Sequence, residues 1–453
     1  MLKRFLPLLA LISLTWLSMS AQDTPKMSLK DAIDYAMQND LSIQNSRLNI
    51  SDAEERITES RAVGIPKIDG DIDYQYYFEV PQAVLPETFE ILARDPVTGE
   101  LPPGFSRQAE FAFRNNLTFG IGASGMIFDG SFFIGLRAAK LYRQYVGQEL
   151  AATERSVRDR VLDAYLPPLI IDENLKILDK NITNLEKILN ETKETYKEGF
   201  VEQLDVDRLE LSMSNLQTER DNLVRQRDIL LNALKMVMGY PMKEAIDISD
   251  DIDVLLIEAS EEDLVGAINF YQRPEYKVAE TGLQLNEANI DLYRVGYLPT
   301  VNAFVNYQYG YQGNQLFHED GFWAPTSLAG INVKVPIFDG FDKRAKIERA
   351  RIALSIAQNQ KKSLERLITL EVQNARASYQ NAKKRVEFQN KNVALAERIY
   401  NTTQIKYKEG VGSSLEVTQA EQALYQTQQN YIQARFELLT AKSELDKALG
   451  KDL

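Results

Sequence analysis

The sequence contains no cysteine and only one histidine, His318. A chain without cysteine has no thiol nucleophile, no zinc–thiolate site, no disulfide and no lipid attached at a cysteine. His318 stands beside Glu319 and Asp320 in a polar stretch, where a lone histidine is expected to be solvated rather than to bind a metal. We therefore expect neither a metal site nor a cofactor.

Basic charge is also scarce. The 65 Asp and Glu residues outnumber the 52 Lys and Arg residues, which gives a formal net charge of −13. Because phosphate binding needs a basic surface, nucleic acid is not an expected partner. The sequence contains no nucleotide-binding loop. Its many carboxylates form no acid–base–nucleophile set, so we assign no catalytic residue and do not expect an enzyme.

A long apolar run occurs near the start of the chain, at residues 6–17. Lys3 and Arg4 precede this run, and small residues ending at Ala21 follow it. This pattern predicts a secretory signal peptide over residues 1–21. The alternative is a retained membrane anchor, which needs about 20 apolar residues, more than the run contains.

The most prominent pattern is an internal duplication. In the second half, apolar, aromatic and small residues recur at alternating spacings of three and four. This spacing predicts long helices that pack against a partner helix along one line of residues, which we call the seam. The seam residues on either side of a turn at Gly410 include Ala375, Tyr379, Ala382, Val386, Val393, Tyr400, Tyr407, Val417, Ala420, Leu424, Tyr431, Leu438 and Leu445. The first half repeats both seams and the turn, at Gly199, displaced by 211 residues (410 − 199).

The duplication sets the expected domain boundaries. After the signal peptide we expect a first repeat over residues 22–239, an inter-repeat segment over 240–260, a second repeat over 261–450 and a tail over 451–453. The inter-repeat segment carries an acidic run of Asp247, Asp250, Asp251 and Asp253. This run lacks the glycine and the terminal glutamate of a calcium loop, so it is expected to be a solvated surface segment.

Each repeat also contains two predicted strands. Apolar residues alternate with polar ones over 68–78 and 117–124 in the first repeat, and over 301–311 and 329–335 in the second. Strands of about ten residues with one apolar face are typical of an outer-membrane barrel. A soluble sandwich with one wet face is the alternative. Four strands cannot close a barrel with a lumen, so we expect the sheet to close with other copies of the chain.

The remaining elements follow from local signals. A capping box of Ser28 and Asp31 predicts a helix that ends near Pro66, and a second helix is expected over residues 261–295. Residues 79–114 form a long, proline-rich loop. Asp129 and its counterpart in the second repeat, Asp339, are expected to cap helices that start at once. Pro167–Pro168 is expected to kink the first long helix without ending it.

These residues resemble those of the TolC-type outer-membrane efflux proteins, also called outer membrane factors. The resemblance rests on the duplicated order of helix, strand, loop, strand, long helix and helix, on the two Phe-Asp-Gly joints, and on the two Tyr-x-x-Gly turns. It implies an α+β membrane protein of TolC-like fold. Four β-strands per chain would contribute to a trimeric 12-strand outer-membrane barrel, and the helices to a long periplasmic α-helical barrel. It places the protein in the outer membrane of a Gram-negative bacterium, in contact with outer-membrane lipid.

The resemblance also implies a function, partners and site residues. It implies the channel of a tripartite efflux or type I secretion system, a homotrimer that docks on a periplasmic adaptor and reaches an inner-membrane pump through it. The positions that match the gate at the periplasmic tip are Asp205, Tyr407, Arg435 and Glu416. The positions that match the adaptor-docking turns are Gly199, Phe200, Val201, Gly410 and Val411. Arg435 should lie far from Tyr407 within one hairpin and reach a neighbouring hairpin.

The sequence departs from the family pattern at Gln419, where some members carry a second constriction acid, and at Gly412, where some carry an arginine. A different class of function remains open from the residues: a trimeric coiled-coil surface stalk or adhesin without channel activity. Such a stalk would not need two barrel segments or two matching tip turns.

Overall fold

The computed structural model describes residues 25–451 apart from positions 107, 111 and 257. The predicted signal peptide over residues 1–21 therefore lies outside the described residues. The chain falls into two compact units. The first combines the chain up to Ser46 with Leu150–Pro274 and Arg366–Leu453, and the second combines Arg47–Glu149 with Glu275–Glu365. Within the described part of the chain, no helix is long and apolar enough to cross a membrane.

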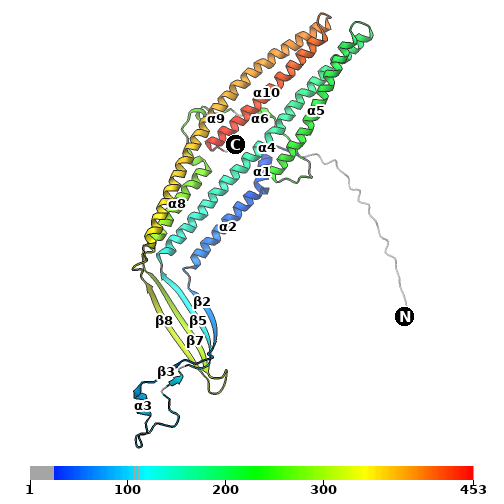
Figure 1. Cartoon of the computed structure of the whole chain (residues 1–453). Helices are drawn as coiled ribbons and strands as arrows, with labels where there is room; N and C mark the ends of the chain where they lie inside the picture. The colour runs from blue at the N-terminus through cyan, green and yellow to red at the C-terminus, as the bar shows by residue number, and fades with distance from the viewer. Residues whose placement is uncertain (1–24, 107, 111, 257, 452–453) are drawn as a thin grey trace, which may run out of the picture. The chain divides into compact units, whose positions relative to one another are not determined.

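The second unit contains a four-stranded antiparallel sheet (Figure 1). In spatial order its strands are β2 (Lys67–Tyr76), β5 (Asn115–Phe128), β7 (Thr300–Gly313) and β8 (Phe322–Lys334). The four strands predicted from the sequence are confirmed, and three of them extend further than the alternation indicated. β2 and β8 form the two edges of this sheet.

The register of the sheet separates an apolar face from a polar face. Asp71 lies opposite Gly120 and Gly120 opposite Gln308, so the polar positions of three strands share one side. On the other side Ile72, on β2, and Ile331, on β8, are each about two-thirds exposed or more (71% and 67%). An open apolar face on strands of this length matches the lipid-facing side of an outer-membrane sheet.

The segment between β2 and β5 is more ordered than a plain loop. It contains a short hairpin of β3 (Gln82–Val84) with β4 (Gln108–Glu110), and the helix α3 (Glu87–Ala93) between them. Residues 79–114 contain prolines that suppress both helix and strand periodicity, so the sequence predicts a single loop there. Pro86 in fact stands at the N-cap position of α3, before the first helical residue, where its missing N–H interrupts no hydrogen bond inside the helix.

Two helical hairpins form most of the first unit, although the first part of α4 and of α9 belongs to the second unit. The first hairpin consists of α4 (Gly130–Lys197) and α5 (Gln203–Met238), and the second of α9 (Asp342–Lys408) and α10 (Ser414–Leu449). The predicted seams form the core of these hairpins. Seam side chains with no exposed surface are Val161, Leu178, Leu185, Leu209, Leu234, Val372, Val417 and Leu445.

A second part of the core lies where short elements cross α4. β1 (Lys26–Met27) pairs in parallel with β6 (Asp247–Ile248), and α1 (Leu29–Asn39) and α6 (Ile252–Leu255) flank this pair. Here α4 continues through Pro167 and Pro168, as predicted. The buried hydroxyl of Tyr165 contacts the Met27 carbonyl at 2.9 Å and thereby ties α4 to β1.

Two predicted helices are interrupted. The helix expected from Ser28 to Pro66 is divided at Asp40 into α1 and α2 (Leu41–Ala62), although its capping box of Ser28 and Asp31 is confirmed. The Asp40 backbone is extended, and its side chain accepts a hydrogen bond from the Ser42 N–H at 2.8 Å, so it caps the next helix. Side-chain capping overrides a continuous apolar pattern here.

The helix expected over residues 261–295 is likewise wrong as a single element. It consists of α7 (Glu261–Val265), a short 3-10 turn (Phe270–Gln272) and α8 (Pro274–Val295). Gly266 is extended and ends α7, and Pro274 starts α8 at the position where its missing N–H costs least. Lys451, in the predicted tail, forms an ion pair with Asp263 of α7.

The two Phe-Asp-Gly joints differ from each other. Asp129 accepts a hydrogen bond from the Ser131 N–H at 2.8 Å, and α4 begins at Gly130, as expected. In the second joint α9 begins only at Asp342, because Gly340 and Phe341 both adopt positive φ angles of 67° and 68°. Asp339 still caps this helix through the Lys343 N–H, at 3.1 Å.

Candidate functional site

The two turns at the hairpin tips have the same backbone construction. Gly199 and Gly410 adopt left-handed φ angles of 81° and 74°. After each glycine the next N–H, of Phe200 or Val411, donates to a carbonyl five residues back, at 3.1 and 3.0 Å. This 6→1 bond is that of a Schellman motif, which satisfies carbonyls at a helix end and favours glycine. The turns therefore need glycine for backbone reasons.

The same turns present apolar side chains to the surroundings. Phe200 and Val411 are each 78% exposed. Nothing lies within 4 Å of a Cβ built on either Gly199 or Gly410, so the glycines themselves are not crowded. Large exposed side chains on a rigid turn are suited to contact with another protein. The docking role that the family resemblance implies for these turns stays a prediction.

A hollow of about 660 Å³ lies between the two tips. It brings together residues that the sequence analysis assigned separately to the docking turns and to the gate. Its lining includes Phe200, Val201, Tyr407 and Gly410. Both hairpins therefore contribute to one concave surface at the tip.

Two polar contacts join the hairpins beside this hollow. The Tyr407 hydroxyl lies 3.2 Å from the Thr192 hydroxyl of α4. Burial raises the pKa of Tyr407, and the charge of Asp205 acts in the same direction, whereas the hydrogen bond with Thr192 acts in the opposite one. Asp205, in the first turn of α5, accepts a hydrogen bond from the Ser414 hydroxyl at the start of α10. Two of the predicted gate residues thus hold one hairpin against the other.

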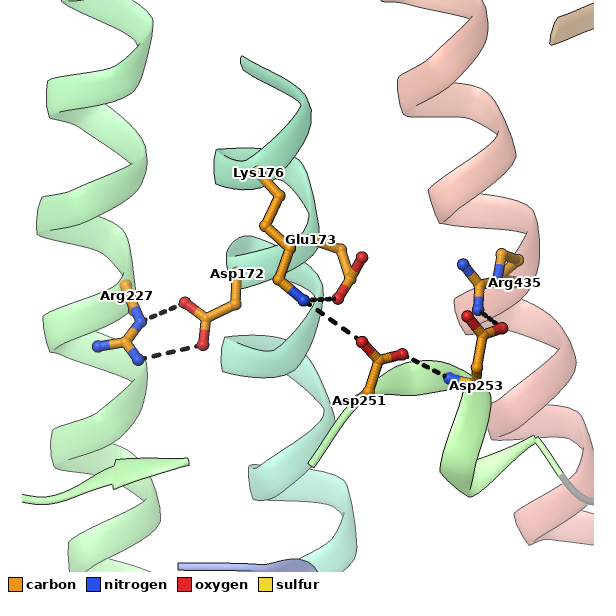
Figure 2. Close-up of polar contacts among 7 residues, drawn as sticks. All are labelled: Asp172, Glu173, Lys176, Arg227, Asp251, Asp253 and Arg435. Atoms are coloured by element: carbon orange, nitrogen blue, oxygen red, sulfur yellow. Dashed lines mark hydrogen bonds and ion pairs between the residues drawn. The ribbon is translucent and has the colours of Figure 1, made fainter. Parts of the chain in front are cut away.

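The remaining two predicted gate residues lie apart from these contacts. Glu416 is exposed in the first turn of α10, where its N–H donates to the Ser413 hydroxyl that caps the helix, at 3.3 Å. Arg435 lies further along the same helix and forms an ion pair with Asp253 of the inter-repeat segment (Figure 2). The expectation that Arg435 reaches a neighbouring hairpin is not met within this chain. The gate assignment as a whole stays a prediction.

The acidic run of the inter-repeat segment is not merely solvated, contrary to the expectation from sequence. Asp247 pairs with Arg227 of α5, and Asp250 accepts from the Leu29 N–H at 2.6 Å. Asp251 lies 3.4 Å from the Lys176 amine of α4, and its other oxygen accepts from the Asp253 N–H at 2.9 Å (Figure 2). The hydrogen bond from Asp253 lowers the pKa of Asp251.

This acidic run therefore joins three long helices, α4, α5 and α10, to the inter-repeat segment. Arg227 lies centrally, because it also forms two hydrogen bonds to Asp172 of α4, and these bonds raise the pKa of its guanidinium (Figure 2). The sequence carries only a partial signal of this network. Arg227 follows Leu223 by four residues and precedes Leu230 by three, so a cation occupies a seam position. Arg220 has the same spacing but pairs with the exposed Asp179, so the spacing alone does not identify a poorly solvated network.

Sequence reasoning also missed a buried carboxyl above the tip. Glu421 of α10 is 5% exposed and accepts from the Ser212 hydroxyl of α5 at 3.3 Å. Asn181 of α4 and Gln428 of α10, both buried, hydrogen-bond at 3.1 Å. Among the described residues, no group of three or more His, Cys, Asp or Glu side chains is arranged to hold a metal ion.

Comparisons with known proteins agree with this architecture. The family model described as outer membrane efflux protein matches residues 271–451, which cover most of the second repeat. The outer membrane protein TolC of Vibrio cholerae is 21% identical over 337 residues, 74% of this chain and 76% of that protein. The probable efflux pump outer membrane protein TtgC of Pseudomonas putida is 20% identical over 352 residues, covering 77% of this chain and 72% of the relative.

The fold matches over a longer stretch than the sequence. The crystal structure of CusC aligns with a TM-score of 0.70 at 17% identity, covering 95% of this chain and 93% of CusC. This likeness extends over the sheet and both hairpins. Because the sequence identity is so low, it shows a shared fold and nothing about function. Together with the family match over residues 271–451 it confirms the resemblance inferred from the sequence: the chain is similar to the TolC-type outer-membrane efflux proteins in sequence and in fold.

Proposed function

We propose that this chain is the outer-membrane channel component of an export system and acts as a passive duct from the periplasm to the outside. The observation that carries the proposal is the four-stranded sheet with one open apolar face and two edges, β2 and β8. Such a face belongs in lipid, where an unpaired strand edge is excluded because its backbone groups find no hydrogen-bond partner. The relatives are named outer membrane protein TolC and probable efflux pump outer membrane protein TtgC, which supports the same function.

The two unpaired edges of the sheet indicate that the chain assembles as a homotrimer. One chain supplies four strands, fewer than the eight of the smallest outer-membrane barrels. Three copies would supply twelve strands and pair each β2 edge with a neighbouring β8 edge. The polar face, with Asp71 and Gln308, would then line the lumen. A water-filled lumen of this kind gives an aqueous path for exported molecules.

The surface of the hairpin tips indicates which partners the channel would bind. A rigid pair of turns that presents Phe200 and Val411 beside a hollow of about 660 Å³ suits the docking of a periplasmic adaptor. The adaptor would recruit an inner-membrane pump, and this pump would supply the energy. The channel itself would need only to open at its tip.

Two measurements on the detergent-extracted protein test this proposal. Native mass spectrometry should give three chains per particle, and a stable folded monomer would contradict the argument from the sheet edges. Planar bilayers containing the purified protein should show discrete ion conductance. The absence of conductance from a correctly assembled trimer would favour the stalk or adhesin, which the comparisons do not support.

A further inference from the structure

The contact between the two hairpins contains one ionisable carboxyl in an otherwise apolar setting. Glu421 lies on α10 one turn beyond Val417, inside a core cluster to which all four long helices contribute. The apolar members of this cluster include Leu185 and Ile188 of α4, Leu209 and Met213 of α5, Tyr400 of α9, and Val417 and Leu424 of α10. Such a position disfavours a charge, because burial removes the water that would stabilise it.

The polar surroundings of Glu421 do not compensate for its burial. One oxygen, Oε2, accepts the hydrogen bond from Ser212 at 3.3 Å. The other, Oε1, is buried without a hydrogen-bond partner among the described residues. No salt bridge to a lysine or arginine is found for this carboxyl in the described structure.

The titratable groups around Glu421 do not favour its ionised form. Tyr400 on α9 interacts electrostatically with it, and burial together with this carboxyl raises the pKa of Tyr400 to about 12. On α10 itself Tyr425 lies one turn further on and feels the charge of Glu219 on α5. α4 faces the site with leucine and isoleucine. Burial raises the pKa of Glu421 to about 7, and the hydrogen bond from Ser212 acts in the opposite direction.

We propose that Glu421 is a proton-operated latch between the two hairpins: its protonated form lets α10 pack against α5, and its ionisation drives the hairpins apart above the tip. The proposal deepens the proposed function, because separation of the hairpins would open the duct. Two other hairpin contacts, Thr192 with Tyr407 and Asp205 with Ser414, lie closer to the tip turns. The latch would thus make closure of the tip dependent on pH.

The direction of the pH effect follows from linkage. A carboxyl whose pKa is higher in the packed state stabilises that state fully below its ordinary pKa, near 4.5. This stabilisation is lost as the pH rises toward about 7, because the packed state then binds a proton that the separated state releases. Within this window the packing equilibrium at each site should shift by up to about tenfold per pH unit.

The test combines a channel readout with a structural one. Conductance of the purified trimer in planar bilayers, without adaptor, should rise between pH 5.5 and 8. Hydrogen exchange, corrected for the intrinsic effect of pH, should show weaker protection of α5 residues 205–216 and α10 residues 414–428 at pH 8. Glu421→Gln should abolish both pH responses and hold the low-pH behaviour throughout. Ser212→Ala should move the midpoint upward, because the ionised carboxyl loses its hydrogen-bond donor.

Glu397→Gln is the matched control, since Glu397 is an exposed glutamate on α9, and it should retain both pH responses. A wild-type protein with pH-independent exchange at α5 and α10 would overturn the latch, as would an unchanged pH response in Glu421→Gln. If the protein formed no conducting channel but the exchange data followed the prediction, the latch would stand and the duct function would fail.

Discussion

At the scale of single residues, the inter-repeat segment depends most on Arg227. Its guanidinium binds both oxygens of Asp172 and one oxygen of Asp247, and the three side chains are only 21–28% exposed. A charged hydrogen-bond network of this kind leaves two poorly solvated carboxylates unpaired when its centre is removed. The residue therefore contributes more than an ordinary surface ion pair.

We predict that Arg227→Gln lowers the free energy of unfolding of the helical part by about 1.5–3 kcal/mol. The measurement is the unfolding of the purified protein in guanidinium chloride, monitored by circular dichroism. Arg220→Gln is the matched control, because Arg220 lies one heptad earlier on α5 and pairs with the exposed Asp179 of α4. That control should change the unfolding midpoint little. Equal effects of the two substitutions would mean that the network of Arg227 with Asp172 and Asp247 contributes no more than an exposed ion pair.

At the scale of elements, the two tip turns have the most specific requirement. Gly199 and Gly410 need a left-handed backbone but have open space around the α-carbon. A β-branched residue in that conformation costs roughly 1–2 kcal/mol of backbone strain. Because no neighbouring atom stands in the way of the side chain, the substitution acts through this strain, and the turn changes its shape to relieve it. The shape of the turn positions Phe200 and Val411.

We predict that Gly199→Val or Gly410→Val abolishes export in cells that depend on this protein, while a folded trimer still reaches the outer membrane. Gly199→Asn and Gly410→Asn serve as controls, because asparagine tolerates the left-handed conformation and should retain most activity. Drug susceptibility and the trimer content of membranes are the two measurements. Unchanged susceptibility in the valine variants would leave the glycines as helix caps without a docking role.

The elements also show what the sequence could and could not predict. The period-2 and heptad patterns identified β2, β5, β7, β8 and the four long helices, because burial on one face imposes those periods directly. Breaks such as Asp40 were missed, since a side-chain cap can interrupt a helix without disturbing the apolar pattern. Ion-pair partners such as Asp253 with Arg435 were missed as well, because they join segments 182 residues apart in the chain.

The same reasoning applies to the candidate site. Tyr407 and Asp205 were identified by family resemblance, and the structure supplies their partners, Thr192 and Ser414. The position of Arg435 could be anticipated in part. It lies 21 residues beyond Ser414 (435 − 414), which is on the order of 30 Å along a helix with ~1.5 Å rise per residue. Which acidic residue it binds depends on the path of the inter-repeat segment.

At the scale of the whole molecule, the question is which contacts would keep a duct closed. Two kinds of contact in the structure could hold the duct closed. The tip contacts, Thr192 with Tyr407 and Asp205 with Ser414, join the two hairpins beside the hollow at the turns. The contact of Arg435 with Asp253 instead joins α10 to the inter-repeat segment. If closure depends on holding the hairpins together at the tip, the first kind should control it.

We predict that Tyr407→Phe combined with Ser414→Ala raises single-channel conductance in planar bilayers without adaptor, and that the trimer remains intact by native mass spectrometry. Both substitutions remove one hydroxyl and little volume, so the apolar packing around Leu189 and Val417 should persist. Arg435→Ser should raise conductance less, because its ion pair lies away from the tip and Asp253 is 79% exposed, where solvent replaces much of the lost interaction. The reverse order of effects would place closure at the inter-repeat segment. Wild-type conductance in both variants would direct attention to Glu416, whose exposed carboxylate in the first turn of α10 could form a charged ring with its copies around a threefold axis.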